Sequence, residues 1–272
     1  ILNGFARFSM QHSAVFAAFR QPVLTCMKDF NNQNLAMIAH AHATLALRDE
    51  TLLHAVAARL WVQCSAGQEA VSSNHISSIA NAYAVKLGYT PPELVRVVEF
   101  SLPKVMKSMT ASELVLTIPA LWRLEGLRVS DDFCRVVFSG CIRLWPQLRH
   151  AGVHAVLDTA ARLNHRDLTF WSFAWEDCTK RLNDVTWEVR HVVSLAQICS
   201  QSWTQLCAVH TPKGGPAPLG HEKQKLFAAI RTQYELRSKE FDARAVGILA
   251  STFVLAEEPE LQLLKAAHGP GR

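Results

Sequence analysis

The sequence predicts an all-α protein, an α-solenoid of stacked helical hairpins with about six to seven degenerate repeats of about 38 residues. Three observations lead to this prediction. A short apolar-rich motif recurs at nearly constant spacing, apolar residues within each copy recur three and four positions apart, and glycine, proline and helix-capping residues separate the copies. No strand-rich segment interrupts the pattern.

The recurring motif is a heptamer, whose clearest copies are ILNGFAR at 1–7, IAHAHAT at 38–44 and IANAYAV at 79–85. Weaker copies occupy 117–123, 156–162 and 192–198. We call the third residue of each heptamer the index residue. Index residues fall at 3, 40, 81, 119, 158 and 194, so neighbouring copies lie 36 to 41 residues apart. So regular an interval indicates a repeat array.

Each repeat contains two helical patterns, of which the first carries the index residue. Around the index residue at 81, for example, Ile76, Ile79, Tyr83 and Leu87 share one face of a helix. The first helices are predicted over 33–47, 74–88, 111–126, 150–164 and 186–202. The second helices, which follow a short turn, are predicted over 50–64, 92–107, 131–145 and 167–182.

Turn residues support these helix limits. Gly88 and Gly126 are the last residues of predicted helices, where a left-handed backbone commonly ends a helix. Thr90, which precedes two prolines, and Ser130, which precedes an acidic residue, are predicted N-caps.

One segment cannot continue the helical pattern. Residues 209–223, VHTPKGGPAPLGHEK, have glycine or proline at six of their fifteen positions. The sequence therefore divides into a degenerate helical-repeat array over 1–208, an inserted loop over 209–221, and C-terminal helices over 222–265 that continue the array.

Composition restricts the class of protein. Of the 272 residues, 49% are hydrophobic and 19% charged, which is typical of a folded chain, and no apolar run is long enough for a membrane-spanning helix. The net charge of +5 suits an anionic partner such as RNA but does not require one. The seven cysteines are odd in number and form no CxxC pair, which favours free, buried thiols in a reducing compartment.

Motifs for catalysis and cofactor binding are absent from the sequence. It has no GxxxxGK[ST], GxGxxG, GxSxG or HExxH. His150 and His154 have the spacing of a metal-binding pair, but no third ligand follows at a suitable distance. We therefore expect no catalytic residues, no metal site and no cofactor, and a protein that is not an enzyme.

A family resemblance is specific over 90–127, TPPELVRVVEFSLPKVMKSMTASELVLTIPALWRLEGL. This segment resembles an octotricopeptide repeat and is similar to heptatricopeptide and FAST-kinase-like repeats, and in degenerate form the likeness extends over about 1–203. The matching positions are Pro91, Pro92, Leu94, Leu102, Ala120, Leu121, Trp122, Leu124 and Gly126.

The resemblance implies an organellar RNA-binding protein. It implies a place in the mitochondrial matrix, with a plastid as the alternative, and a role in RNA processing, translation or the ribosome itself. The expected partners are organellar RNA, ribosomal RNA in particular, and the protein subunits of a large ribonucleoprotein, without membrane insertion. The terminal RAP domain that such proteins often carry is not visible in this sequence.

Two sets of residues are candidates for RNA contact. The first follows the index positions and the positions four residues later, which lie one helical turn along the same face. Its members are Asn3, Arg7, His40, Asn81, Arg123 and Arg162. The second lies on the second helices and could hold phosphates without reading sequence. Its members are Arg96, Lys104, Lys107 and Arg135. In both cases an ordinary solvated helix face, or a polar residue bonded to a neighbouring turn, remains the alternative.

The segment TFWSFAWED at 169–177 is unusually aromatic. Phe170, Trp171, Phe173 and Trp175 could form a protein-docking surface, or they could be part of a thick core. The sequence thus favours RNA binding by a repeat array, with protein–protein scaffolding within a large organellar assembly as the alternative.

Overall fold

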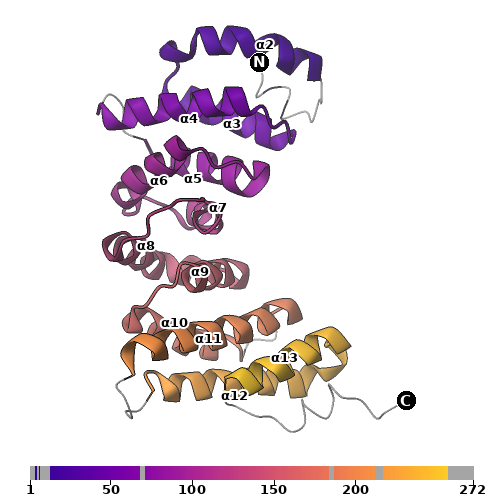
Figure 1. Cartoon of the computed structure of the whole chain (residues 1–272). Helices are drawn as coiled ribbons and strands as arrows, with labels where there is room; N and C mark the ends of the chain where they lie inside the picture. Colours follow the sequence, from indigo (N-terminus) through magenta and orange to yellow (C-terminus); the bar gives the residue numbers. More distant parts are fainter. Residues whose placement is uncertain are drawn as a thin grey trace. The chain divides into compact units, whose positions relative to one another are not determined.

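A computed structural model describes residues 13–67, 71–183, 187–211 and 217–256, together with Gly4 and Ala6. In these residues twelve α-helices, α2 to α13, follow one another without a strand (Figure 1). The predicted all-α class is therefore confirmed. The chain forms two compact units, Ile1–Gln147 and Leu148–Arg272.

The first unit contains seven of these α-helices in the described residues. They are α2 (Ser13–Thr25), α3 (Asn32–Thr44), α4 (Glu50–Ser65), α5 (Ser73–Ala80), α6 (Pro92–Val105), α7 (Ala111–Leu121) and α8 (Asp131–Leu144). Short helices complete the unit: η1 (Met27–Asp29), the π-helix η2 (Asn81–Leu87) that continues α5, and η3 (Trp145–Gln147).

Helices of the first unit pack in two rows. In the first row α3 contacts α5, and α5 contacts α7; in the second row α4 contacts α6, and α6 contacts α8. Figure 1 shows the second row along one side of this unit and the first row along the other. Each helix thus contacts its next-but-one neighbour in sequence, the order that hairpins stacked on one another produce.

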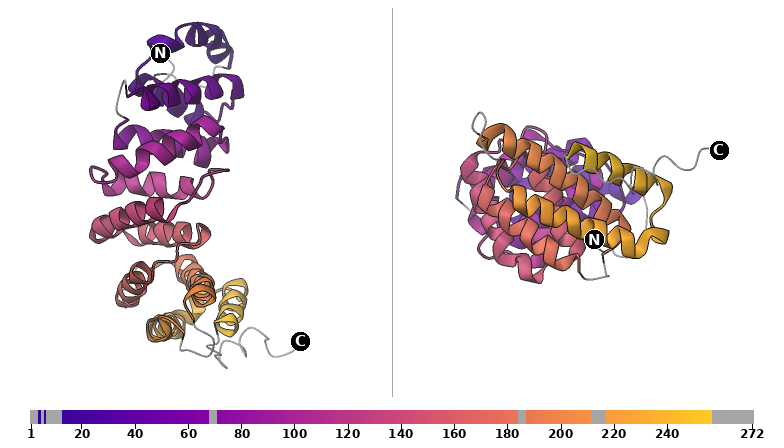
Figure 2. Two further views of the ribbon diagram at one scale, coloured as in Figure 1. Left: turned by 60° about the vertical axis from the view of Figure 1, so that its left-hand side comes forward. Right: turned by 90° about the horizontal axis from the view of Figure 1, so that it is seen from below.

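The second unit has the same order of contacts. Its α-helices are α9 (His150–Arg162), α10 (Leu168–Arg181), α11 (Val189–His210), α12 (Gly220–Arg237) and α13 (Ala243–Leu255), and η4 (Ser238–Glu240) precedes α13. A first row of α9, α11 and α13 packs beside a second row of α10 and α12. The left view of Figure 2 looks nearly along α11 to α13, whose axes run close to parallel.

Helix α11 differs from its prediction. The sequence predicted a helix over 186–202 and a loop from 209, but α11 continues to His210. Leu206 explains the extra turns, because it extends the apolar face of the helix and is fully buried. The next helix, α12, begins at Gly220. Residues 212–216 of the predicted loop, and the 257–265 end of the predicted C-terminal helices, lie outside the described residues.

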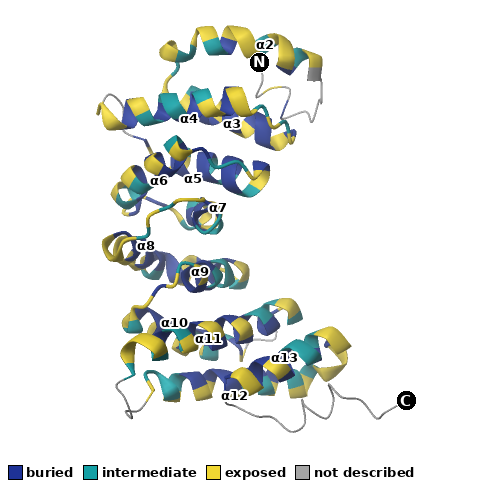
Figure 3. Cartoon of the chain, in the orientation of Figure 1, coloured by how far each residue is buried: buried dark blue, intermediate teal, exposed yellow. Residues whose placement is uncertain are grey.

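Burial follows the helical period that the sequence displays. In α6, Leu94, Val98 and Leu102 are fully buried. Figure 3 shows buried residues on the sides of helices that face other helices and exposed residues on the outer sides. The exposed side of α6 includes Arg96 and Phe100, one helical turn apart.

Some of the predicted helix ends are confirmed. Gly88 ends η2 with a φ angle of 57°, in the left-handed region that lacks a steric penalty only for glycine. Gly126 is also left-handed, with a φ angle of 83°, but the predicted helix end there is wrong, because α7 already ends at Leu121 and Gly126 closes the turn that follows. Ser130 is the N-cap of α8 and accepts a hydrogen bond from the Phe133 backbone N–H. Thr90 is not an N-cap, because α6 begins one residue later, with Pro91 in the cap position and Pro92 as the first helical residue.

All seven cysteines lie in described residues and are free, as the sequence predicted. Five are buried; Cys26 is exposed and Cys207 is half-buried. Burial raises the pKa of the Cys134 thiol to about 11 and raises that of Cys141 further. Both thiols are therefore protonated and unreactive at neutral pH.

A recurring contact joins the second row to the linkers. Long polar side chains near the ends of second-row helices donate hydrogen bonds to backbone carbonyl groups in the linker before a first-row helix. Gln63 of α4 donates to Phe30 at 2.6 Å, and Arg143 of α8 donates to Met106 at 2.9 Å and Met109 at 3.0 Å. In the second unit, Arg181 of α10 donates to Leu148 at 2.9 Å.

We predict that Arg143→Met destabilises the protein by about 1 kcal/mol, because two linker carbonyl groups lose a charged donor. Lys104→Met is the matched control near the end of α6, since Lys104 makes no such hydrogen bond within the described residues. Its expected change is within about 0.5 kcal/mol. Urea unfolding followed by circular dichroism measures both, and equal losses would contradict a structural role for Arg143.

Candidate nucleic-acid interface

The index residues of the first unit lie on the first row of helices. His40 is exposed on α3, Asn81 is half-buried at the first residue of η2, and Pro119 is half-buried inside α7. Asn3 and Arg7 lie outside the described residues. A groove of about 380 Å³ runs between α3 and α5. Its polar lining contains no lysine, arginine or carboxylate and consists of Gln33, His40, Asn74, His75 and Ser78.

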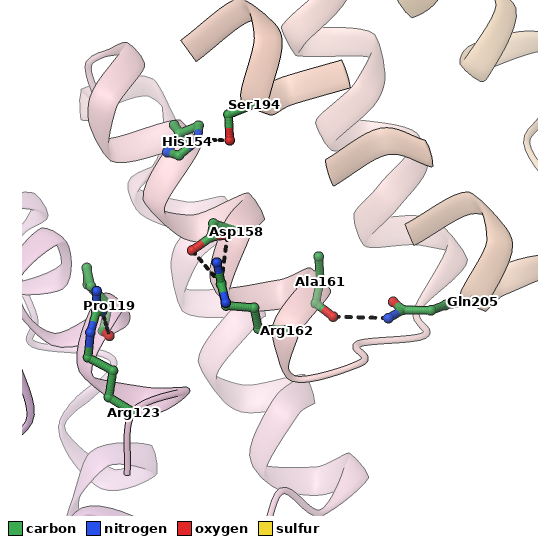
Figure 4. A network of polar contacts seen from close by, with 8 residues as sticks. All are labelled: Pro119, Arg123, His154, Asp158, Ala161, Arg162, Ser194 and Gln205. Carbon is green, nitrogen blue, oxygen red and sulfur yellow. Dashed lines mark hydrogen bonds and ion pairs between the residues drawn. The ribbon is translucent and has the colours of Figure 1, made fainter. Parts of the chain in front are cut away.

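Among the described residues, the two arginines that follow an index residue by four positions, Arg123 and Arg162, each bind that index residue. In the first unit the Arg123 guanidinium donates to the Pro119 carbonyl and lies 4.0 Å from the centre of the Trp122 ring. In the second unit Arg162 Nε lies 2.9 and 3.0 Å from the two carboxylate oxygens of Asp158 (Figure 4). The RNA contact predicted for Arg123 and Arg162 stays a prediction, although both guanidinium groups already have partners within the protein. The spacing that puts each arginine on the index face also lets it bind the index residue itself.

A different row of side chains is free of such partners. Arg96, Phe100, Lys104 and Lys107 lie three or four residues apart on α6 and just beyond its end, and all four are exposed. We call them the α6 stripe. Among the described residues, none of its three cations has an acidic partner. Lys104 Nζ instead lies 3.0 Å from the centre of the Phe100 ring.

Acidic residues of α6 contact other parts of the unit. Glu93 lies 3.6 Å from His54 Nδ1 of α4, and Glu99 accepts a hydrogen bond of 2.5 Å from the Arg128 backbone N–H. The carboxylates thus point toward protein groups while the cations face solvent. The exposed side of α6 therefore has a positive excess that the overall charge of the chain only suggests.

Arg135, the fourth predicted phosphate ligand on the second helices, differs from the other three. It forms an ion pair with Asp132 one turn earlier on α8, and both side chains are exposed. A phosphate would have to compete with the Asp132 carboxylate for the Arg135 guanidinium, so we expect Arg135 to bind phosphate more weakly than the other three cations. Phe100, in contrast, was not among the candidate residues. The sequence does contain a pattern that could have identified Phe100, because Arg96 lies four positions before it and Lys104 four positions after it.

The predicted protein-docking aromatics belong mainly to the core of the second unit. Phe170, Trp171 and Trp175 are 1% exposed or less, and the Trp171 indole donates to the His165 carbonyl at 2.7 Å. Phe173 alone reaches the surface, at 36% exposure. The docking surface is therefore wrong for three of its four residues, and the core alternative holds, because their positions on α10 face the packed side of the helix.

A histidine cluster lies between α9 and α11 of the second unit. His154 Nε2 lies 2.7 Å from the hydroxyl of Ser194, the index residue of α11 (Figure 4), and its ring centre lies 5.2 Å from that of His191. Burial lowers the pKa of both rings; the neighbouring His191 lowers that of His154 further, while Asp158 opposes the shift. Ser194 lies inside α11, where its backbone N–H bonds within the helix, so that N–H does not serve as an oxyanion donor.

The described parts of the chain contain neither a candidate metal site nor a candidate membrane-spanning helix. No three histidine, cysteine, aspartate or glutamate side chains there lie close enough to hold a metal ion. In the same residues, no helix combines the length and apolarity that crossing a membrane requires.

Comparison with known proteins adds no assignment. No model of a protein family matches the chain, and no curated protein matches its sequence. Any functional inference therefore rests on the chain's own residues.

We predict that the protein loses stability as the pH falls below about 6.5, the ordinary pKa of histidine. The pKa of His154 and His191 is lower in the folded protein, so the unfolded chain binds more protons in this range and acidification favours unfolding. His154→Gln should reduce this dependence, because it removes one of the two rings whose pKa burial lowers. Urea titrations at several pH values test this, and identical pH profiles for wild type and His154→Gln would contradict it.

Proposed function

We propose that the protein is a non-catalytic helical-repeat protein, an α-solenoid of about six to seven degenerate repeats, that binds RNA through the α6 stripe. The stripe would contact the phosphate backbone and single-stranded segments rather than read a long sequence. We further propose the mitochondrial matrix as its location and ribosomal RNA within a large ribonucleoprotein as its target.

One observation carries the RNA proposal. The α6 stripe joins three exposed cations without acidic partners to an exposed aromatic ring. Lysine and arginine bind phosphates in a sequence-independent way, and aromatic rings stack on bases of any identity. This combination suits a single-stranded nucleic acid better than it suits a neutral protein surface.

Packing within the two units supports the repeat proposal. Next-but-one helix contacts and hydrogen bonds from second-row helices to linker carbonyl groups occur in each unit. Recurrence of one contact at equivalent places is what a repeated structural element would produce. The organellar location and the ribosomal target rest on the resemblance of 90–127 to octotricopeptide repeats.

A protein scaffold without RNA contact is the second candidate function. It is favoured by apolar side chains exposed on the second row of the first unit, Val62 at 48%, Phe100 at 41% and Val136 at 41%. Exposed apolar groups on neighbouring helices are typical of protein interfaces. The cations of the α6 stripe are not typical of a protein interface, because charged residues are depleted at the centres of such interfaces.

We predict that changing Arg96, Lys104 and Lys107 together to glutamine weakens binding of a single-stranded RNA by about tenfold or more at low salt. The plot of log affinity against log salt concentration should also flatten by about 2, because each lost phosphate contact in single strands accounts for about 0.7 of the slope.

The matched control changes Lys86, Lys180 and Lys239 to glutamine, which removes the same charge from other exposed places. Fluorescence anisotropy with a labelled 12-nucleotide RNA measures both variants. Equal effects would show that overall charge, not the α6 stripe, is responsible. A wild-type protein that binds no RNA at low salt would support the scaffold function instead.

A further inference from the structure

Two residues of the α6 stripe, Phe100 and Lys104, also line a pocket. The pocket has a volume of about 380 Å³ and lies between the last turn of α4 and the second half of α6. Residues that line it include Cys64, Ser65, Phe100, Ser101, Lys104 and Val105. Its size is within the range of pockets that hold small molecules or single chemical groups.

The Phe100 ring is held in place on one side and open on another. Its centre lies 6.1 Å from that of the Trp61 ring, and the two planes meet at 87°, the edge-to-face arrangement that aromatic pairs prefer. Even so, 41% of Phe100 is exposed. A fixed, partly exposed ring at the rim of a pocket provides a surface on which another flat ring can stack.

Lys104 covers that ring but is free to leave it. Its Nζ contacts the face of Phe100, and among the described residues it has no ion pair or hydrogen bond. Arg143 of α8, in contrast, is held by the carbonyl groups of Met106 and Met109. An exposed cation–π contact is weaker than the stacking of a base on an aromatic ring, so a base can displace the ammonium group.

We propose that this pocket binds one nucleotide of a single-stranded RNA. The base stacks on Phe100 in place of Lys104, and the Lys104 ammonium moves to the phosphate of that nucleotide. Arg96 and Lys107 lie on either side along α6 and take flanking phosphates. This inference rests on the proposed RNA binding and adds to it a specific contact with a base.

The test compares two 12-unit RNA probes that carry the same phosphates, oligouridine and an oligomer without bases. Wild type should bind oligouridine about tenfold more tightly, since one stacked base contributes roughly that factor. Phe100→Leu, which keeps an apolar side chain without a π system, should lose this preference while the salt dependence stays as in wild type. Phe100→Trp should keep the preference.

Circular dichroism and thermal unfolding establish that each variant is folded, and Phe100→Ala provides a second test if the leucine variant is not. A preference for bases that survives in the folded leucine or alanine variant would overturn the pocket assignment, while salt-dependent binding of both probes would leave the proposed function standing. Binding of neither probe would overturn both. Competition by an oligoglutamate peptide as strong as by oligouridine would assign the pocket to a protein partner and also overturn the proposal.

Discussion

Backbone carbonyl groups at helix ends and in linkers need hydrogen-bond donors, and side chains of second-row helices supply several of them. The last turn of every α-helix leaves carbonyl groups without partners inside the helix, and the short linkers add more. Side chains of second-row helices supply donors to these groups, as Gln63, Arg143 and Arg181 do. Arg237 of α12 likewise donates to the Trp187 carbonyl at 2.7 Å. Each of these bonds fixes the end of a helix against a linker segment distant in sequence.

Because some cations bind these carbonyl groups or a carboxylate, the cations of the chain differ in how available they are to a ligand. Arg143 and Arg181 are engaged with backbone carbonyls, and Arg162 is engaged with the carboxylate of Asp158. Carboxylates compensate the charges of Arg162 and Arg181, through Asp158 and Asp177, while the carbonyl groups fix the position of the Arg143 guanidinium. Lys104 occupies a comparable place on α6 without such a bond, so its charge remains available at the surface beside Phe100. Net charge alone does not distinguish these two groups.

Much of the fold could be predicted from the sequence, because helical period and turn chemistry are local properties. The spacing of Ile76, Ile79 and Tyr83 gives the buried face of α5 and η2, and Gly88 gives its end. The error at Thr90 is a shift of one residue, since a proline can itself hold the cap position.

The candidate site was less predictable, because spacing identifies which side chains share a face but not what each one contacts. Arg123 and Arg162 have the spacing of a surface column, yet each binds the residue four positions before it in the chain. Phe170 and Trp175 likewise share a run with exposed residues but are buried by α10's neighbours. Phe100 shows the opposite case. An apolar side chain in an apolar helix looks like core, and only tertiary packing reveals that it is exposed.

Burial of the thiols has a practical consequence for spectroscopy. Cys64, Cys134, Cys141, Cys178 and Cys199 are enclosed, whereas Cys26 in the first unit is exposed and Cys207 in the second is half-buried. A maleimide reagent should therefore react first at Cys26 and next at Cys207, without removal of any native cysteine. The chain thus supplies one attachment point for a fluorophore or spin label in each unit, and an interprobe distance between them would report directly on the solution arrangement of the two.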